Sequence, residues 1–190
     1  MFSLSHHLAN RLVQNEIISN EDYEVYRFGI ECFIMKAVHI ITYLLIGLWL
    51  HMLRELIVFL IVFIPIRVYS GGYHAKTPLK CYFVSCGAVL TAVFIMKNAP
   101  SFIMNNSIIW AFVVSLLLVI IVPVESSNKP LDLAEKIYYK KKARIIIMVC
   151  LGLATVLRGF SLDYISFIIT LSLTYELGIA LIGVVMKDSQ

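Results

Sequence analysis

The stretch from Arg67 to Cys86 reads RVYSGGYHAKTPLKCYFVSC, and the hydrophobic segments of the chain lie on either side of it. It places a histidine and a cysteine, His74 and Cys81, seven residues apart between two apolar segments. If the backbone between them is helical, the two side chains lie on one face, two turns apart. Pro78 either interrupts that helix or begins a new one at its first turn, where a missing amide hydrogen costs nothing. Both geometries allow an imidazole to approach a thiol.

A histidine near a cysteine indicates covalent catalysis. A thiol becomes a competent nucleophile when a histidine takes its proton, or when a cation or a helix N-terminus stabilises the thiolate. Lys80 and Arg67 are nearby cations. Gly71 and Gly72 allow a sharp turn that brings backbone amides close to a substrate, as an oxyanion hole requires. The stretch therefore contains the groups that a cysteine nucleophile needs.

The same residues also have a structural interpretation. Cysteine often acts as a small buried hydrophobe, which is how we interpret Cys32, Cys86 and Cys150, each in an apolar run. The neighbours of Cys81 favour catalysis instead. Arginine, two glycines, histidine, threonine, proline and lysine precede it within fifteen residues, and a membrane protein has little structural reason to place them between apolar segments.

Composition identifies the broad class. The chain has 190 residues, of which 60% are hydrophobic, with a mean hydropathy of +0.86. A soluble domain of this size could not bury so much apolar surface. The four cysteines have no metal-ligand spacing, so we expect no metal and no cofactor, and the net charge of +4 gives no reason to expect nucleic acid.

Hydrophobic segments predict an all-α polytopic membrane protein with about six transmembrane helices in a single membrane domain over residues 1–190. Residues 1–20 predict an amphipathic helix at the membrane interface, or equally a soluble helix packed on the cytoplasmic face of the protein. Loops are expected at 67–78 and 123–144. The predicted spans are about 28–50, 53–66, 79–96, 102–122, 145–157 and 164–186.

Basic residues predict the orientation. Six spans place both termini on one side of the membrane, and if that side is cytoplasmic, twelve lysines and arginines fall on it and only three on the opposite side: Arg54, Lys97 and Arg158. The stretch with His74 and Cys81 then lies at the cytoplasmic boundary, where a reducing compartment keeps a thiol free.

The motif residues of the chain are PVE at 123–125, NKPL at 128–131, and Arg67, Gly71, Gly72, His74, Ala75, Thr77, Cys81 and Ser85. They resemble those of the accessory gene regulator protein B (AgrB) family of bacterial quorum sensing. The resemblance extends over most of the chain, including its length and the six-segment pattern.

The resemblance implies a cysteine endopeptidase in the bacterial cytoplasmic membrane. Its substrate would be a precursor peptide with an amphipathic leader, a core with an internal cysteine, and an acidic C-terminal tail. By position, Cys81 would attack the bond between core and tail with His74 as general base, leaving the core as a thioester on Cys81. The cysteine of the substrate would then displace it and close a thiolactone ring.

Residues around the predicted catalytic pair each have more than one possible role. Arg67 either holds the tail, orients a loop carbonyl, or extends to the interface from the end of a span. Ser85 hydrogen-bonds within the site or back to its own helix. Candidates for a group that orients the histidine are Glu125 and Asp132. A basic cluster offers a landing surface for the acidic tail, or only fixes topology and contacts anionic lipid: Lys136, Lys140, Lys141, Lys142 and Arg144.

Two functions from other classes compete with the peptidase. A peptide exporter or a nonenzymatic membrane receptor component would use the glycine-rich stretch as a re-entrant loop, and Cys81 would be incidental. An intramembrane metalloprotease is disfavoured, because the sequence has no HExxH pattern and His74 has no ligand-spaced partner. The sequence also allows a homodimer.

Overall fold

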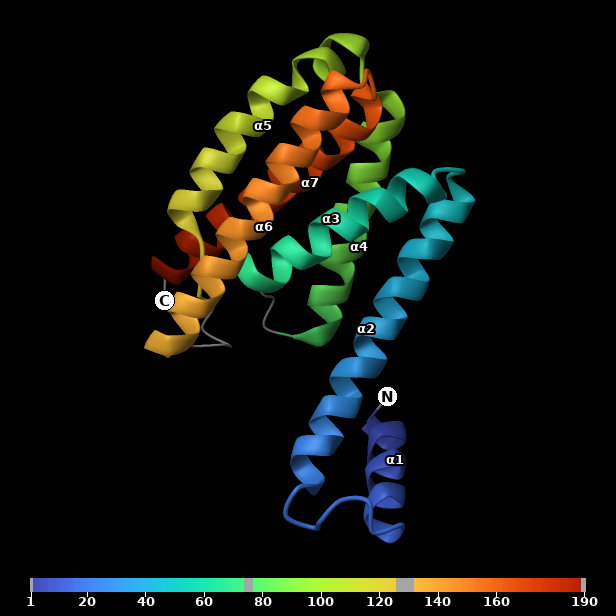
Figure 1. Ribbon diagram of the computed structural model, residues 1–190. Helices are drawn as coiled ribbons and strands as arrows, with labels where there is room; N and C mark the ends of the chain where they lie inside the picture. The colour runs from blue at the N-terminus through green and yellow to red at the C-terminus, as the bar shows by residue number, and fades with distance from the viewer. Residues whose placement is uncertain (1, 74–76, 126–131, 189–190) are drawn as a thin grey trace. The chain divides into compact units, whose positions relative to one another are not determined.

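The computed structural model describes residues 2–73, 77–125 and 132–188 (Figure 1). These residues form seven α-helices, which confirms the helical fold class. The helices are α1 (Phe2–Gln14), α2 (Tyr23–Trp49), α3 (Leu53–Ser70), α4 (Pro78–Asn98), α5 (Ser101–Ile121), α6 (Leu133–Gly159) and α7 (Asp163–Asp188).

Four of these helices are long and apolar enough to cross a membrane: α2, α4, α5 and the part of α7 from Asp163 to Met186. The structure therefore describes a helical, multi-pass membrane protein. It does not support the predicted six spans, because the segments 53–66 and 145–157 belong to helices α3 and α6, which are not among the four. Charged residues lie at both ends of α3 and throughout the first half of α6.

Several predicted boundaries were wrong. The N-terminal helix ends at Gln14, not at residue 20, and α2 begins at Tyr23, ahead of the span predicted at 28–50. Helix α3 continues through Pro65 to Ser70, so the predicted loop at 67–78 starts later. The predicted loop at 123–144 is helical from Leu133 onward, because Asp132 caps α6 in a capping box with Glu135.

Contacts divide the chain into two units, residues 1–45 and 46–190. In the first unit, α1 lies against the start of α2. His6 Nδ1 is 2.8 Å from the Tyr23 hydroxyl, and its Nε2 is 3.2 Å from Arg27 Nη1. Arg27 also pairs with Glu24 at 2.7 Å. These polar contacts hold the amphipathic helix against the first turns of α2.

The second unit is built around α7, which packs against α3, α4, α5 and α6. Figure 1 shows α5, α6 and α7 running alongside one another. Small hydroxyl residues let neighbouring backbones approach α7 closely. Ser166 donates to the Ala154 carbonyl of α6 at 2.9 Å, and Ser172 to the Phe59 carbonyl of α3 at 3.3 Å.

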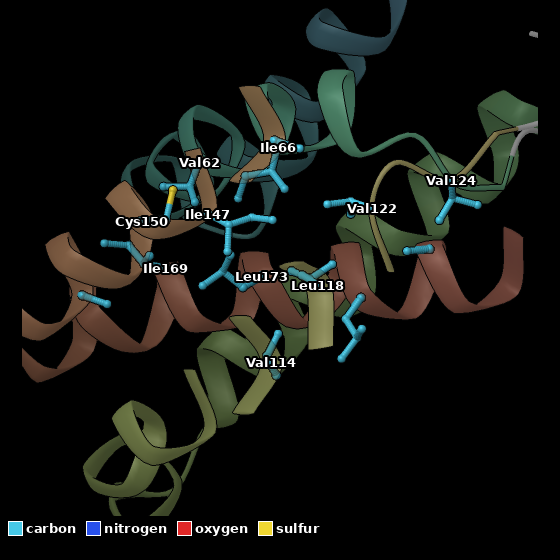
Figure 2. Packing of buried hydrophobic residues seen from close by; sticks show 14 residues of the cluster. Val62, Ile66, Val114, Leu118, Val122, Val124, Ile147, Cys150, Ile169 and Leu173 are labelled. Atoms are coloured by element: carbon cyan, nitrogen blue, oxygen red, sulfur yellow. The ribbon is translucent and has the colours of Figure 1, made fainter. Parts of the chain in front are cut away.

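Aliphatic side chains fill the space between α3, α5, α6 and α7, as Figure 2 shows. This cluster extends past the end of α5 into the segment 122–124, where the Val122–Pro123 peptide bond is cis. The core therefore reaches the chain segment that lies next to the double glycine. Its labelled members are Val62, Ile66, Val114, Leu118, Val122, Val124, Ile147, Cys150, Ile169 and Leu173.

Candidate active site

Cys81 lies in the first turn of α4, as one of the two predicted geometries required. Thr77 is the N-cap, in an extended conformation, and its hydroxyl accepts a hydrogen bond from the Lys80 amide at 3.3 Å. Pro78 occupies the first helical position. The Cys81 amide donates to the Thr77 carbonyl at 3.0 Å. Cys81 therefore lies at the N-terminal end of a capped helix.

His74 lies outside the residues that the structure describes, so its contact with Cys81 stays a prediction. Extended Thr77 excludes the alternative of one continuous helix joining the two positions. The other predicted neighbours are on α4: Lys80 is exposed, and Ser85 lies one turn beyond Cys81 and is half-buried.

The cysteines differ in their surroundings. All four are free thiols; Cys150 is buried, whereas Cys32, Cys81 and Cys86 are half-buried. The structural interpretation of Cys150 therefore agrees with its place in the core, while Cys32 and Cys86 are more accessible than a core position implies.

Arg67, in the last turn of α3, joins the glycine stretch to α7. Its guanidinium donates to the carbonyls of Gly71 and Tyr73. On its other side, Nη1 lies 3.8 Å from a carboxylate oxygen of Glu176, and Arg67 also interacts electrostatically with Cys81. Of the roles considered for Arg67, these contacts match the orientation of loop carbonyls. Arg67, the predicted cation, therefore lies near Cys81, the predicted nucleophile.

Gly71 and Gly72 both have positive φ, +73° and +110°, in the region that favours glycine. Gly71 forms a parallel bridge with Val124, in which the Val124 amide donates to the Ser70 carbonyl at 2.8 Å and the Gly72 amide to the Val124 carbonyl at 3.0 Å. A Cβ on Gly71 would lie 2.1 Å from the Val124 carbonyl oxygen. Glycine is therefore required at Gly71 by both conformation and space.

The backbone amides of this stretch donate inside the protein. Gly71 donates to the Arg67 carbonyl at 3.3 Å, and Tyr73 to the Ile179 carbonyl of α7 at 3.2 Å. With the Gly72 bond to Val124, all three amides have carbonyl partners. The prediction that the double glycine presents amides to a substrate is therefore not met in this conformation. These residues shape the chain and fix it to its neighbours.

Two residues of α7 belong to this neighbourhood and were missed from the sequence. Gly183 leaves room for the stretch, since a Cβ there would lie 2.7 Å from the Tyr73 nitrogen. Glu176 is completely buried. It is the single acidic residue between Asp163 and Asp188, and an ionisable residue inside an apolar segment is a signal of function that the sequence already contained.

The whole basic cluster lies on the first half of α6 rather than in a loop, and its members have different partners. Lys136 pairs with Glu125 at 2.7 Å, Lys142 lies over the Tyr138 ring at 5.7 Å, and Arg144 donates to the Val119 carbonyl at 3.2 Å. Lys140 and Lys141 are both exposed. The cluster is therefore not a uniform patch.

A cavity of about 520 Å³ lies beside the basic cluster. Lys136, Lys140 and Glu125 provide its charged lining, and Val124 connects it to the double glycine. Glu125 and Asp132, the two candidates for orienting His74, have other partners: Glu125 pairs with Lys136, and Asp132 accepts a hydrogen bond from the Glu135 amide at 2.6 Å.

Within the described parts of the chain, no three histidine, cysteine or acidic residues lie close enough together to hold a metal ion. The site described so far consists of one accessible thiol at a helix N-terminus, a clamped arginine, and a buried carboxylate. Together with the apolar helices, it defines a multi-pass helical membrane protein with a candidate thiol site at one end of its bundle.

The chain belongs to the accessory gene regulator B family, whose model matches residues 5–182. It is 28% identical over 148 residues to an AgrB-like protein of Clostridium perfringens, covering 74% of this chain and 69% of that protein. An AgrB-like protein 2 of another strain is 26% identical over 77% of this chain and 71% of its own length. An AgrB-like protein of Listeria innocua is 26% identical, covering 80% of this chain and 75% of that protein.

No solved structure matches the chain. The family acts on the precursor peptide of the accessory gene regulator quorum-sensing system. A role for this protein in the processing of such a peptide follows from its membership.

Proposed function

We propose that this protein is a membrane-embedded cysteine endopeptidase that removes the C-terminal tail of a quorum-sensing precursor peptide and supports thiolactone closure. The observation that carries the proposal is the position of Cys81. Its thiol is half-buried in the first turn of a capped helix and interacts electrostatically with Arg67. A helix N-terminus and a cation both lower the cost of forming the thiolate that must attack the peptide.

The reaction has two transfers of one acyl group. His74 takes the proton of the Cys81 thiol, and the sulfur attacks the carbonyl carbon between core and tail. The C–N bond then breaks, His74 returns the proton to the departing amine, and the core stays on Cys81 as a thioester. The thiol of the substrate cysteine next attacks the same carbon, closing the ring, while Cys81 leaves as a thiolate and takes up the proton that this thiol loses.

The second transfer competes with hydrolysis. A thioester exchanged for another thioester keeps most of its bond energy, so closure can compete only where water is kept from the acyl group. Cys81 lies on a helix that is apolar enough to cross a membrane, which favours such a site. In the orientation we propose, α3 and α6 cross the membrane as well, and both termini, Cys81 and the basic end of α6 face the cytoplasm.

The substrate tail is acidic in our proposal, and the cavity lined by Lys136 and Lys140 has complementary charge. Val124 lines this cavity and also pairs with Gly71, so a tail bound there would approach the glycine stretch. Membrane lipid is the other partner we expect, and it competes as an explanation of the same lysines.

Coexpression of the protein with the short open reading frame beside its gene tests the proposal, with the peptide followed by mass. Wild-type protein should release the tail, whereas Cys81→Ala and His74→Ala should leave the precursor whole. Cys86→Ala is the matched control, because Cys86 is a half-buried thiol on the same helix. Equal processing by all variants would contradict the peptidase proposal and favour an exporter or a receptor component.

A further inference from the structure

Glu176 is a buried carboxylate that no step of the proposed reaction uses. Its side chain is 0% exposed, in the middle of α7. Within the described residues, neither of its carboxylate oxygens has a hydrogen-bond partner. The nearest cation is Arg67, whose Nη1 is 3.8 Å from Oε1 of Glu176. A packing role alone does not account for this residue, because an apolar side chain of similar size would fill the same space without the cost of burying a carboxylate.

The guanidinium of Arg67 connects this carboxylate to the glycine stretch. Arginine carries five N–H donors in a rigid fork, so contacts on one side fix the direction of the other. In this protein the donors on Nη1 and Nη2 bind the carbonyls of Gly71 and Tyr73. Those carbonyls lie on either side of Gly72, in the segment that leads directly to His74.

The space around Gly72 makes the segment sensitive to the position of Arg67. A Cβ on Gly72 would lie 2.6 Å from Arg67 Nη1 and 3.1 Å from the Ile179 carbonyl oxygen. The guanidinium thus packs directly on the backbone that it binds, and α7 closes the other side. A small change in the direction of the guanidinium would therefore move the backbone of Gly72 and Tyr73.

We propose that Glu176 is a positioning residue of the candidate active site, holding Arg67 in the direction in which it fixes the glycine stretch. Glu176 acts through Arg67 and does not itself contact the substrate. The consequence for rate rests on the proposed peptidase function. The positioning of Arg67 by Glu176 does not depend on that function, so the positioning and the effect on rate can be tested separately.

Hydrogen exchange tests the positioning without any peptide. The Gly72 amide donates to Val124 and the Tyr73 amide to Ile179, so both should be protected in the wild-type protein. Glu176→Gln, which keeps the shape and replaces the carboxyl group by an amide, should raise exchange in the segment 68–73 by roughly tenfold or more and leave α5 and α6 unchanged. Asp163→Asn is the control, since Asp163 pairs with an arginine at the other end of α7.

Two exchange results would overturn the proposal. One is an unchanged rate in the segment 68–73 of Glu176→Gln. The other is faster exchange throughout the bundle, which would show that Glu176 supports the fold as a whole.

A double-mutant cycle tests whether Glu176 acts through Arg67. Glu176→Gln should lower kcat for tail removal about 10- to 100-fold with KM nearly unchanged, because the reacting groups are displaced while the substrate still binds. In an Arg67→Met background, Glu176→Gln should cause no further loss of kcat. In that background Glu176→Gln should also raise the amount of protein in the membrane, because Arg67→Met alone leaves the buried carboxyl group of Glu176 without its nearest cation.

Losses of kcat that multiply in the double variant would contradict this route. If the wild-type protein removes no tail, the peptidase function fails, while the exchange experiment still decides whether Glu176 positions the stretch.

Discussion

The two sides of the candidate site differ in how firmly the chain is held. Arg67, Gly71 and Gly72 lie against α7 and against the segment 122–124, and every backbone amide from Gly71 to Tyr73 has a carbonyl partner. Cys81 begins a helix with little support: in α4, all of which the structure describes, no residue before Val89 is buried. The glycine stretch is thus the fixed side of the site, held by tertiary contacts. The first half of α4 is the open side, held mainly by its helix cap.

This difference suggests a division of labour. A site that forms an acyl intermediate must hold some groups still and still admit a peptide to the nucleophile. The glycine stretch meets the first need because its conformation is determined by neighbours on three elements. The first half of α4 meets the second, because its faces are open to a substrate.

Gly71→Ala should give the largest effect, on the fixed side. The new Cβ would overlap the Val124 carbonyl oxygen at 2.1 Å and would sit at a φ of +73°, which costs about 1–3 kcal/mol for a non-glycine residue before the overlap is counted. We expect the bridge to Val124 to open and tail removal to be lost. Thermal unfolding in detergent and the processing assay measure the two effects.

The control for Gly71→Ala lies on the open side. A Cβ on Gly87 of α4 would meet nothing within 4 Å, so Gly87→Ala should be neutral or slightly stabilising. Equal losses from both substitutions would show that the two sides are not held differently.

Gly183→Ala should have the next largest effect. Its Cβ would lie 2.7 Å from the Tyr73 nitrogen and 2.8 Å from the Gly72 carbonyl carbon, so α7 and the glycine stretch must move apart. We expect a lower kcat with the helices retained, because α7 keeps an ordinary helical backbone there. Gly178→Ala on the same helix meets nothing within 4 Å and should behave like wild type; a similar loss there would contradict the account.

Thr77→Ala sharpens the comparison from the open side. Loss of the side-chain cap costs about 0.5–2 kcal/mol, and with few other contacts the first turn of α4 should fray. The alkylation rate of Cys81, measured in a variant without the other three cysteines, should change. Thr77→Ser keeps the hydroxyl and should restore the wild-type rate; no difference between the two variants would mean that the cap does not hold Cys81.

Lys140→Gln should give the smallest effect. Lys140 lines the cavity beside Val124, where an exposed ion pair with an acidic tail is worth about 0.2–1 kcal/mol. KM should rise up to several-fold and kcat should stay constant. Lys97→Gln, at the far end of α4, is the control, and an equal rise in KM there would indicate a nonspecific effect of charge.

The sequence was informative wherever local chemistry decides structure. Pro78 indicated the start of α4 as one of two possible geometries, and the apolar runs predicted helices that the structure confirms. It failed where a boundary depends on more than hydropathy. The first half of α6 is polar enough to be taken for a loop, yet the capping box at Asp132 starts a helix there.

Tertiary contacts were beyond prediction. Nothing local in the sequence indicates that Val124 pairs with Gly71, or that Gly183 leaves space for Tyr73, because the partners are far apart in the chain. Glu176 is a different case. A lone acidic residue in an apolar helix was visible, and its partner Arg67 had already been selected, but the pairing of α3 with α7 could not be derived.

The most direct test of the peptidase mechanism is to trap the acyl-enzyme. A precursor whose own cysteine is replaced by alanine cannot close a ring, so the core should remain on the protein. Intact-mass measurement after incubation should show wild-type protein heavier by the acyl core, with the adduct on Cys81 and removable by hydroxylamine, and no adduct on Cys81→Ala. Tail release without any adduct, or an adduct on Cys86, would contradict Cys81 as the nucleophile.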